Sequence, residues 1–346
     1  MKSKSKKILK IAAGIFAFIL IFAALQRLLE PKYTNSVFEG RLIAEYYKDA
    51  KNHELMFFGD CEVYENFSPV TFFEEYGINC YIRGGANQTI WQSYYLLEEA
   101  LKYETPKVVA FNVLSMKYSE PVKEEYNRLN IDGMRLSSSK ISSVNASYMK
   151  GESLLSYLFP ILRYHDRITE LNSDDFKYFF GTPTLSYNGY LLQTGVKPAT
   201  YFPNPDTYQK LPSYEFAQIC YDYLDKMTEL CKNKGIEFVL IKAPSVMPYW
   251  YPQWEEQIVK YAAEKELKYY NFYKPAEEIG IDWDTDTYDG GLHLNVYGAE
   301  KLSLYFGRIL INDLKGKGIK FTDFRTNSKI IDKWQSKIER YNTAKK

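Results

Sequence analysis

The hydrophobic pattern begins with one long apolar run close to the N-terminus. About 15 residues from Ile11 to Leu25 carry no charge, and the run grows to about 18 if Ile8 and Leu9 join it while Lys10 extends its ammonium to the lipid headgroups. The lysines before the run place the N-terminus in the cytoplasm if the run spans a membrane. No clean small-x-small cleavage site follows, so we expect a signal-anchor; a cleaved signal peptide and a soluble amphipathic helix stay as alternatives.

Short apolar runs farther along the chain predict a parallel sheet. Each run has the length of a buried strand, and helical patterns separate one run from the next. The expected strands are 55–58, 79–82, 107–114, 236–241 and 268–272. The expected helices are 69–76, 89–103, 214–232, 254–265 and 296–310. Strands that alternate with helices pair in parallel with right-handed crossovers, so we predict a three-layer, flavodoxin-like α/β fold with about five parallel strands.

The alternation of strands and helices stops between residues 117 and 212. This stretch is rich in Ser, Asn, Tyr and Pro, and only residues 152–171 carry a convincing helical pattern. We interpret it as an insertion or lid. The expected organisation is a cytoplasmic basic start with the membrane helix (1–31), a juxtamembrane linker (32–53), the α/β domain with its insertion (54–312), and a basic C-terminal tail (313–346) that forms a solvated helix or lies near an anionic membrane.

Composition and charge limit the class of protein. The 346 residues carry a formal net charge of +1, and 25% of them are charged. A net charge this close to zero gives no support for a nucleic-acid partner. Both ends of the chain are basic, so the body between them is acidic. Mean hydropathy is −0.38 and no second long apolar run exists, which predicts a single-pass protein with a large external domain.

Tyrosine is unusually frequent, with 32 residues in an aromatic content of 17%. Its flat apolar face and polar tip suit sugar surfaces and headgroup regions, although a tyrosine-rich core is an equal alternative. The aromatic run 249–254 follows a predicted strand, where it would either stack on sugar rings or pack on the core.

The four cysteines do not form a recognisable framework. Cys220 and Cys231 are eleven residues apart in a helical pattern, which separates them by roughly 16 Å and excludes a mutual disulfide. No Cys or His spacing typical of a metal site exists, so we expect neither a metal nor another cofactor.

Two loops contain candidate catalytic residues. Ligands of parallel sheets bind beyond the carboxyl ends of the strands, where the loops 59–66 and 284–295 are expected. Cys61 would begin the helix after the first strand, a position that can activate a thiol, unless it is simply a small buried hydrophobe. His293 lies in the second loop with Asp289 nearby. A histidine oriented by a carboxylate is the base that nucleophilic acyl transfer requires, although a single loop histidine can also be structural.

These residues resemble the motifs of the SGNH, or GDSL-type, esterase and acyltransferase superfamily. Its Gly-Asp-Ser motif after the first strand corresponds to Gly59-Asp60-Cys61, and its Asp-x-x-His motif before the last helix corresponds to Asp289 and His293. The resemblance covers about 54–312 apart from the insertion. It implies that Cys61 is the nucleophile, His293 the base and Asp289 the acid that orients it.

The remaining motifs of the family fit less closely. Gly85 corresponds to the glycine whose amide helps to bind the oxyanion, and Asn87 in the same loop is a further substrate-binding candidate. The Gly-x-Asn-Asp motif is missing, so its asparagine donor is assigned to Asn112, with Ser115 as an equal rival. The chain also departs from the family in having Cys instead of Ser, and in placing the acid four residues before the histidine rather than three.

The overall build resembles the membrane-anchored branch of this superfamily, which includes the D-alanyl transfer proteins of teichoic-acid modification and the alginate O-acetylation proteins. The resemblance implies a bacterial, single-pass membrane protein whose outer domain moves or removes acyl groups on a cell-envelope polysaccharide, beside a multispanning membrane-bound O-acyltransferase. The alternative is a catalytically inactive module that binds glycan or docks on such an acyltransferase.

Overall fold

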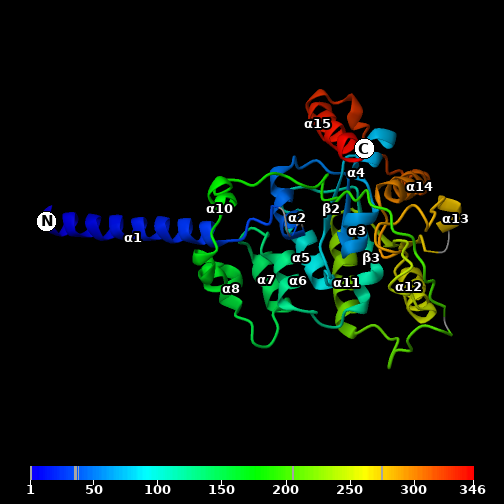
Figure 1. The fold of residues 1–346 in the computed structure, drawn as a ribbon, viewed down its shortest axis with the longest axis horizontal. Coiled ribbons are helices and arrows are strands. Elements are labelled where there is room, and N and C mark those ends of the chain that lie inside the picture. Colours follow the sequence, from blue (N-terminus) through cyan, green and yellow to red (C-terminus); the bar gives the residue numbers. More distant parts are fainter. Residues whose placement is uncertain (1, 35–36, 38, 205, 274–275) are drawn as a thin grey trace.

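The computed structural model describes residues 2–34, 37, 39–204, 206–273 and 276–346, and its centre is a five-stranded sheet (Figure 1). The strands are β1 (Leu55–Gly59), β2 (Cys80–Gly84), β3 (Val108–Asn112), β4 (Glu237–Lys242) and β5 (Lys268–Asn271). All neighbours pair in parallel in the order β2-β1-β3-β4-β5. This is the flavodoxin-like order, and it confirms the predicted fold class.

Helices cover both faces of the sheet, which explains the unbroken apolar strands. Phe58 faces one layer, made by α5 (Ile90–Ala100), α11 (Gln218–Asn233) and α12 (Pro252–Glu264). Phe57 faces the other, made by α3 (Cys61–Asn66), α4 (Pro69–Tyr76) and α14 (Val296–Lys315). Successive strand residues point to opposite faces, so a strand covered on both sides must be apolar throughout.

The other helical elements lie around this core. They are α1 (Lys2–Leu29), α2 (Glu39–Glu45), η1 (Tyr46–Lys48), η2 (Val113–Lys117), α6 (Glu124–Ile131), α7 (Ser138–Ser147), α8 (Leu154–Leu158), α9 (Ile161–Tyr164), η3 (His165–Thr169), α10 (Ser173–Lys177), α13 (Ala276–Ile279), η4 (Phe324–Thr326) and α15 (Ser328–Ala344).

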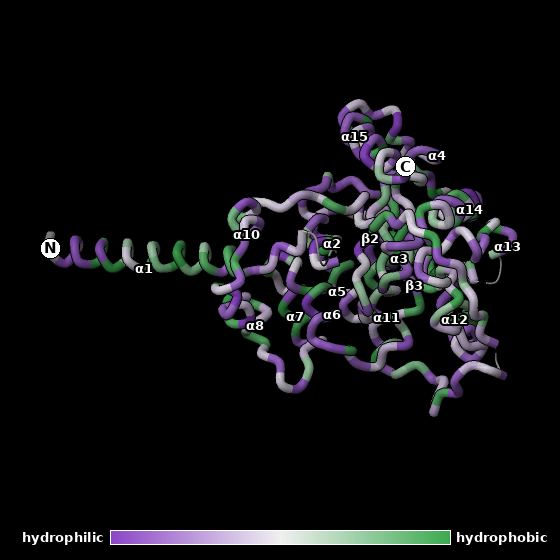
Figure 2. The backbone as a smooth tube through the Cα atoms, viewed as in Figure 1, coloured by the Kyte–Doolittle hydropathy of each residue, from purple (hydrophilic) through white to green (hydrophobic). Residues whose placement is uncertain are grey.

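Helix α1 projects from the body; its outermost turns are hydrophilic, and the turns between them and the body are mostly apolar (Figures 1 and 2). Residues Lys4–Leu29 are long and apolar enough to cross a membrane, and the most apolar part of this stretch is not buried against the protein. The Lys32 ammonium donates hydrogen bonds to the carbonyls of Arg27 (2.6 Å) and Leu28 (3.5 Å). A cation at these last carbonyls stabilises the end of the helix.

The insertion holds more helices than its sequence pattern predicts. The single helix expected over 152–171 is wrong, because α8, α9 and η3 replace it. The break falls at Phe159 and Pro160: proline supplies no amide hydrogen and disfavours helical geometry in the residue before it. Phe159 accordingly leaves the helical region, with φ −123° and ψ 85°. The short helices α6, α7 and α10 also lie in this region, where no helical pattern was evident.

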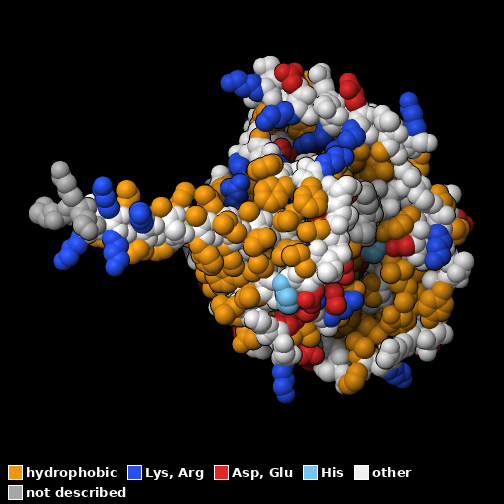
Figure 3. Space-filling model, turned by 60° about the vertical axis from the view of Figure 1, so that its left-hand side comes forward, with side chains coloured by type: hydrophobic (Ala, Val, Ile, Leu, Met, Phe, Trp, Pro, Cys, Tyr) orange, Lys and Arg blue, Asp and Glu red, His pale blue; other side chains and the backbone are white. Residues whose placement is uncertain are grey.

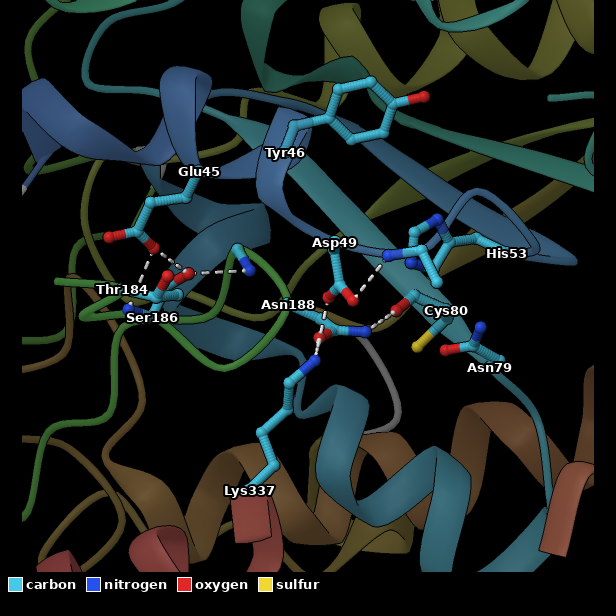
Figure 4. A network of polar contacts seen from close by, with 12 residues as sticks. Glu45, Tyr46, Asp49, His53, Asn79, Cys80, Thr184, Ser186, Asn188 and Lys337 are labelled. Carbon is cyan, nitrogen blue, oxygen red and sulfur yellow. Dashed lines mark hydrogen bonds and ion pairs between the residues drawn. The ribbon is translucent and has the colours of Figure 1, made fainter. Parts of the chain in front are cut away.

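After α10 the chain crosses the edge of the sheet as an irregular strap, residues 182–199. The Glu45 carboxylate accepts hydrogen bonds from the amides of Leu185 (2.7 Å) and Ser186 (3.1 Å). The Ile82 amide of β2 donates to the Asn188 carbonyl (2.9 Å), and the Asn188 side chain donates to the Cys80 carbonyl (2.9 Å) (Figure 4). The strap therefore satisfies polar groups of the edge strand, which protects that edge from other chains.

The C-terminal tail is part of the domain and not a solvated helix. Helix α15 buries Trp334, whose ring stacks on Phe73 with a centroid distance of 4.4 Å. The buried Tyr341 hydroxyl lies 3.2 Å from Ser68 Oγ, and Lys337 pairs with Asp49 at 2.8 Å (Figure 4). The sequence analysis missed this contact because α15 is rich in basic residues and buries only two aromatic side chains, Trp334 and Tyr341.

We predict that Trp334→Ala destabilises the whole domain. Removing a buried, stacked indole should lower the free energy of unfolding by about 3–4 kcal/mol. Urea unfolding of the full chain in detergent measures this loss. Lys329→Ala on the exposed side of the same helix is the control and should change stability little. Equal effects of the two variants would contradict the docked position of α15.

Candidate active site

Cys61 is placed by a sharp turn at the end of β1. Gly59 has φ +150°, and a Cβ there would lie 2.9 Å from Asn112 Cβ, so only glycine fits. The next residue, Asp60, is the N-cap of α3 and accepts a hydrogen bond from the Glu62 amide (3.3 Å). Cys61 is therefore the first residue of the helix, half-buried at the carboxyl end of the sheet.

His293 is held by Asp289 through a compact loop. Asp289 Oδ1 accepts hydrogen bonds from the amides of His293 (2.9 Å) and Leu292 (3.2 Å), and Oδ2 lies 2.7 Å from His293 Nδ1. Gly290 and Gly291 have φ of +86° and +96°, which lets the chain turn back between acid and histidine. The spacing of four residues therefore still brings the carboxylate to the ring.

The structure brings Cys61 and His293 together. The two side chains interact: His293 lowers the pKa of the Cys61 thiol, and Cys61 raises the pKa of His293. Because Nδ1 is occupied by carboxylate, Nε2 is the ring nitrogen left for the thiol. This Cys-His-Asp order has the geometry of a nucleophile, a base and a group that orients the base.

A second carboxylate at the histidine, Glu65, was missed by the sequence analysis. Glu65 Oε2 lies 2.8 Å from His293 Nδ1, and only 6% of the Glu65 side chain is exposed. Tyr288 donates a hydrogen bond to the same oxygen (2.8 Å) and stacks on the imidazole. Glu65 follows Cys61 by four residues, which is one helical turn, so the spacing within α3 was an available signal.

The charges of this cluster shift several pKa values. Burial and Asp60 raise the pKa of the Cys61 thiol, although His293 opposes this. Burial alone would lower the pKa of His293, but Cys61, Asp289 and Glu65 outweigh it and raise that pKa well above its usual range. Burial would raise the pKa of Asp289, but its bonds to His293 lower it. The resting site at neutral pH is therefore a thiol beside an imidazolium that two carboxylates stabilise.

The same three residues offer donor atoms for a metal ion. The candidate ligand atoms of Glu65, Asp289 and His293 all lie within 4.8 Å of one another. Carboxylate and imidazole donors suit a divalent ion such as zinc. The contacts of Nδ1 with Asp289 (2.7 Å) and Glu65 (2.8 Å) are ion pairs, so the histidine ring already engages both carboxylates.

A buried polar network lies beside Cys61 and includes Asn112. The Asn112 side-chain amide donates to Asp60 Oδ1 (3.2 Å) and to Glu62 Oε2 (2.9 Å). Its hydrogens therefore point to carboxylates and not toward an oxyanion. Glu62 pairs with Lys242 at 2.8 Å, with both side chains at most 1% exposed. Burial and Glu62 raise the pKa of Asp60 to about 6.

The structure places the other predicted residues as follows. Gly85 lies beside Asn130, whose Oδ1 would be 1.8 Å from a Cβ at position 85, so this close approach requires glycine. Asn87 accepts a hydrogen bond from the Tyr118 hydroxyl (2.6 Å), and Tyr118 lies close enough to Cys61 for the thiolate charge to raise its pKa. Ser115 is fully buried, and its hydroxyl has no hydrogen-bond partner among the described residues.

The aromatic run after β4 belongs to the core. Tyr249, Trp250, Tyr251 and Trp254 are all buried in the layer of α11 and α12, which favours the packing alternative over sugar stacking.

Two solved structures align with this chain at low similarity. No protein-family model matches the chain. The search of curated proteins also finds no match. A GDSL-like lipase from Bacteroides thetaiotaomicron aligns with a TM-score of 0.37 and 13% identity, over 80% of this chain and 98% of its own. A protein from Bacteroides fragilis named as an acylhydrolase aligns with a TM-score of 0.38 and 13% identity, over 82% and 100%. Values this low do not establish family membership or activity.

We predict that Glu65→Gln makes Cys61 reactive at lower pH. Glu65 raises the pKa of the Cys61 thiol, so its neutral replacement lowers that pKa and increases the thiolate fraction at a given pH. Glutamine can still accept the Tyr288 hydrogen bond. The rate of Cys61 alkylation by iodoacetamide, followed by mass spectrometry between pH 6 and about 10, gives the pH at which half of the thiol is ionised. Glu75→Gln replaces an exposed carboxylate on α4 and should leave this midpoint pH unchanged. A higher midpoint pH in Glu65→Gln would contradict the role assigned to Glu65.

We also predict that Lys242→Met strongly destabilises the fold. The substitution leaves the Glu62 carboxylate buried without its cation, which should cost about 3–5 kcal/mol in urea unfolding. The double variant Glu62→Gln/Lys242→Met removes both charges and should recover a large part of this loss. A double variant as unstable as the sum of the single variants would show that the pair is not coupled.

Proposed function

We propose that this chain is an acyltransferase or esterase that works through a covalent acyl intermediate on Cys61. The observation that carries the proposal is that His293 interacts with the Cys61 thiol and lowers its pKa, while Nδ1 of the same ring lies 2.7 Å from Asp289 Oδ2. This is the arrangement that activates a thiol toward an acyl carbonyl. Half-burial of Cys61 at the carboxyl end of the sheet is consistent with access for a substrate.

The mechanism follows from this geometry. The reactive form has one proton fewer than the resting pair of thiol and imidazolium. In that form the neutral His293 ring takes the thiol proton as the Cys61 sulfur attacks the carbonyl carbon of an ester, forming a tetrahedral oxyanion. The C–O bond to the leaving alkoxide then breaks, the imidazolium protonates that oxygen, and an acyl thioester remains on Cys61. Water or an acceptor hydroxyl attacks the thioester while His293 takes its proton, and the thiol is regenerated as the acid or the new ester leaves.

Oxyanion stabilisation is assigned to backbone amides. The amides of Cys61 and Gly85 are our candidates, and each such donor is worth about 3 kcal/mol in the transition state. Asn112 is less suited than the family pattern implies, because its amide hydrogens are directed at Asp60 and Glu62. Asn87, held by Tyr118 near Cys61, is the side-chain candidate for contacting substrate.

The proposed substrate is an acylated cell-envelope polysaccharide outside a bacterial cell membrane. The apolar helix α1 supports a membrane anchor, with the basic N-terminus in the cytoplasm and the α/β domain on the other side. A membrane-bound O-acyltransferase is the proposed partner, and no nucleic acid is involved. These assignments rest on the motif resemblance together with the anchor.

An inactive module that binds glycan or docks on an acyltransferase is the second candidate. It is favoured by one observation: burial raises the pKa of the Cys61 thiol, which keeps the nucleophile protonated at neutral pH. The two candidates differ in whether Cys61 becomes acylated.

We predict that an activated ester, p-nitrophenyl acetate, acetylates Cys61 in the full chain. His293→Ala should slow acetylation by about 10²-fold or more, because the thiol loses its base. Intact-mass spectrometry measures the adduct, and Cys61→Ala should abolish it. His165→Ala replaces an exposed histidine of the insertion and serves as the matched control with an unchanged rate.

Glycan or partner binding that survives in Cys61→Ala, together with no Cys61-dependent adduct in the wild-type protein at any pH up to about 9, would refute the enzyme and favour the module.

A further inference from the structure

The insertion makes direct contact with the membrane helix. The rings of Phe22 in α1 and Phe159 between α8 and α9 meet edge to face, with centroids 6.2 Å apart. Arg27 Nε donates a hydrogen bond to the Phe179 carbonyl (2.9 Å), and Arg167 donates to the Leu29 carbonyl. The body is thereby attached to the last turns of α1 at several points.

The position of Phe22 sets the depth of Phe159. Phe22 lies inside the uncharged run from Ile11 to Leu25. A helix rises 1.5 Å per residue, so Phe22 is about 10 Å back along α1 from Leu29. If the apolar run occupies the hydrocarbon of a bilayer, a side chain in contact with Phe22 must lie at a similar depth. The turn between α8 and α9 then lies below the headgroups.

The part of the insertion around this turn exposes apolar side chains. Six of them are between 42% and 97% exposed: Leu155, Phe159, Leu162, Ile168, Phe176 and Phe180. Leu155 lies in α8, Phe159 at the break after it and Leu162 in α9, so the three are close in sequence around the turn between the two helices. In the space-filling view, hydrophobic side chains gather where α1 joins the body (Figure 3). We call these six residues the juxtamembrane surface.

We propose that the juxtamembrane surface is embedded in the lipid bilayer, as a second, monotopic attachment beside α1. The proposal rests on the anchoring part of the proposed function and not on its chemistry. Large apolar side chains of an interfacial helix gain free energy in the region between headgroups and acyl chains. The exposed Lys177 lies in the same segment, and a cation there would meet lipid phosphates.

Lipid is the occupant that the contacts favour over a protein partner. The surface is continuous with a helix of membrane-spanning character, and the Phe22–Phe159 contact places it at membrane depth without help from another chain. Two attachments also prevent the body from swivelling about α1. In Figure 1, α1 leaves one end of the body and α3 lies in the half away from that end, so Cys61 would be held away from the lipid, toward a polymer outside.

The test is fluorescence quenching of the full chain in vesicles of phosphatidylcholine and phosphatidylglycerol with brominated acyl chains. The emission that the new tryptophan adds to that of the wild-type chain should be quenched at least about twofold more in Phe159→Trp than in Val259→Trp. Val259 is a similarly exposed apolar position on α12, at the other end of the body (Figure 1). Ile19→Trp reports the depth of α1 itself. Leu162→Trp replaces Phe159→Trp if that variant fails to fold, as judged by the rate of Cys61 alkylation.

The outcomes separate the two proposals. Quenching at positions 19 and 159 but not at 259 supports the embedded surface. Quenching at 19 alone overturns it and leaves a protein partner as the occupant, while the anchor stands. The absence of quenching at position 19 would refute the membrane anchor, and this proposal with it. Acetylation of Cys61 is measured separately, so its loss refutes only the catalytic proposal.

Discussion

The active end of the sheet depends on charges buried in an apolar interior. Lys242, the last residue of β4, pairs with Glu62 of α3, and Asn112, the last residue of β3, joins Glu62 to Asp60 at the end of β1. Unpaired, any of these groups would cost several kcal/mol in this environment. The network therefore requires three strand ends and the start of α3 to stay in register, and that register is what positions Cys61.

The cluster of Cys61, Glu65, Asp289 and His293 is a separate electrostatic unit beside this network. His293 carries two carboxylates on one nitrogen and the thiol on the other side, so its positive charge is stabilised before any chemistry occurs. The cost is a thiol whose pKa is raised by burial and neighbouring acids. A site of this kind supplies a strong acid–base partner to the nucleophile, while the thiolate itself forms only when the pair loses a proton.

The insertion links the end of the body where α1 emerges to the loop that holds Asp289 and His293. Its strap binds the edge strand at Ile82 and then reaches the loop, where the Lys197 amide donates to the Thr287 carbonyl (2.9 Å) and the Gly290 amide donates to the Lys197 carbonyl (3.1 Å). These backbone hydrogen bonds fix the strap to the body, whereas a mobile lid would make few such bonds. Its sequence pattern is nevertheless weak, because it packs as short helices and extended backbone against a body that already has its core.

The sequence alone predicts the five strands, their parallel pairing and the membrane-type helix. Strands buried on two faces and an uncharged apolar span are recognisable from local sequence, without knowledge of tertiary contacts. The pairing of Cys61 with His293 also follows in outline, since both lie at carboxyl ends of parallel strands. Only the tertiary structure decided the rest. Glu65 joins the histidine across two elements, Asn112 turns to internal carboxylates, and α15 docks through Trp334. Each of these contacts joins side chains from distant parts of the chain, and local periodicity does not predict such contacts.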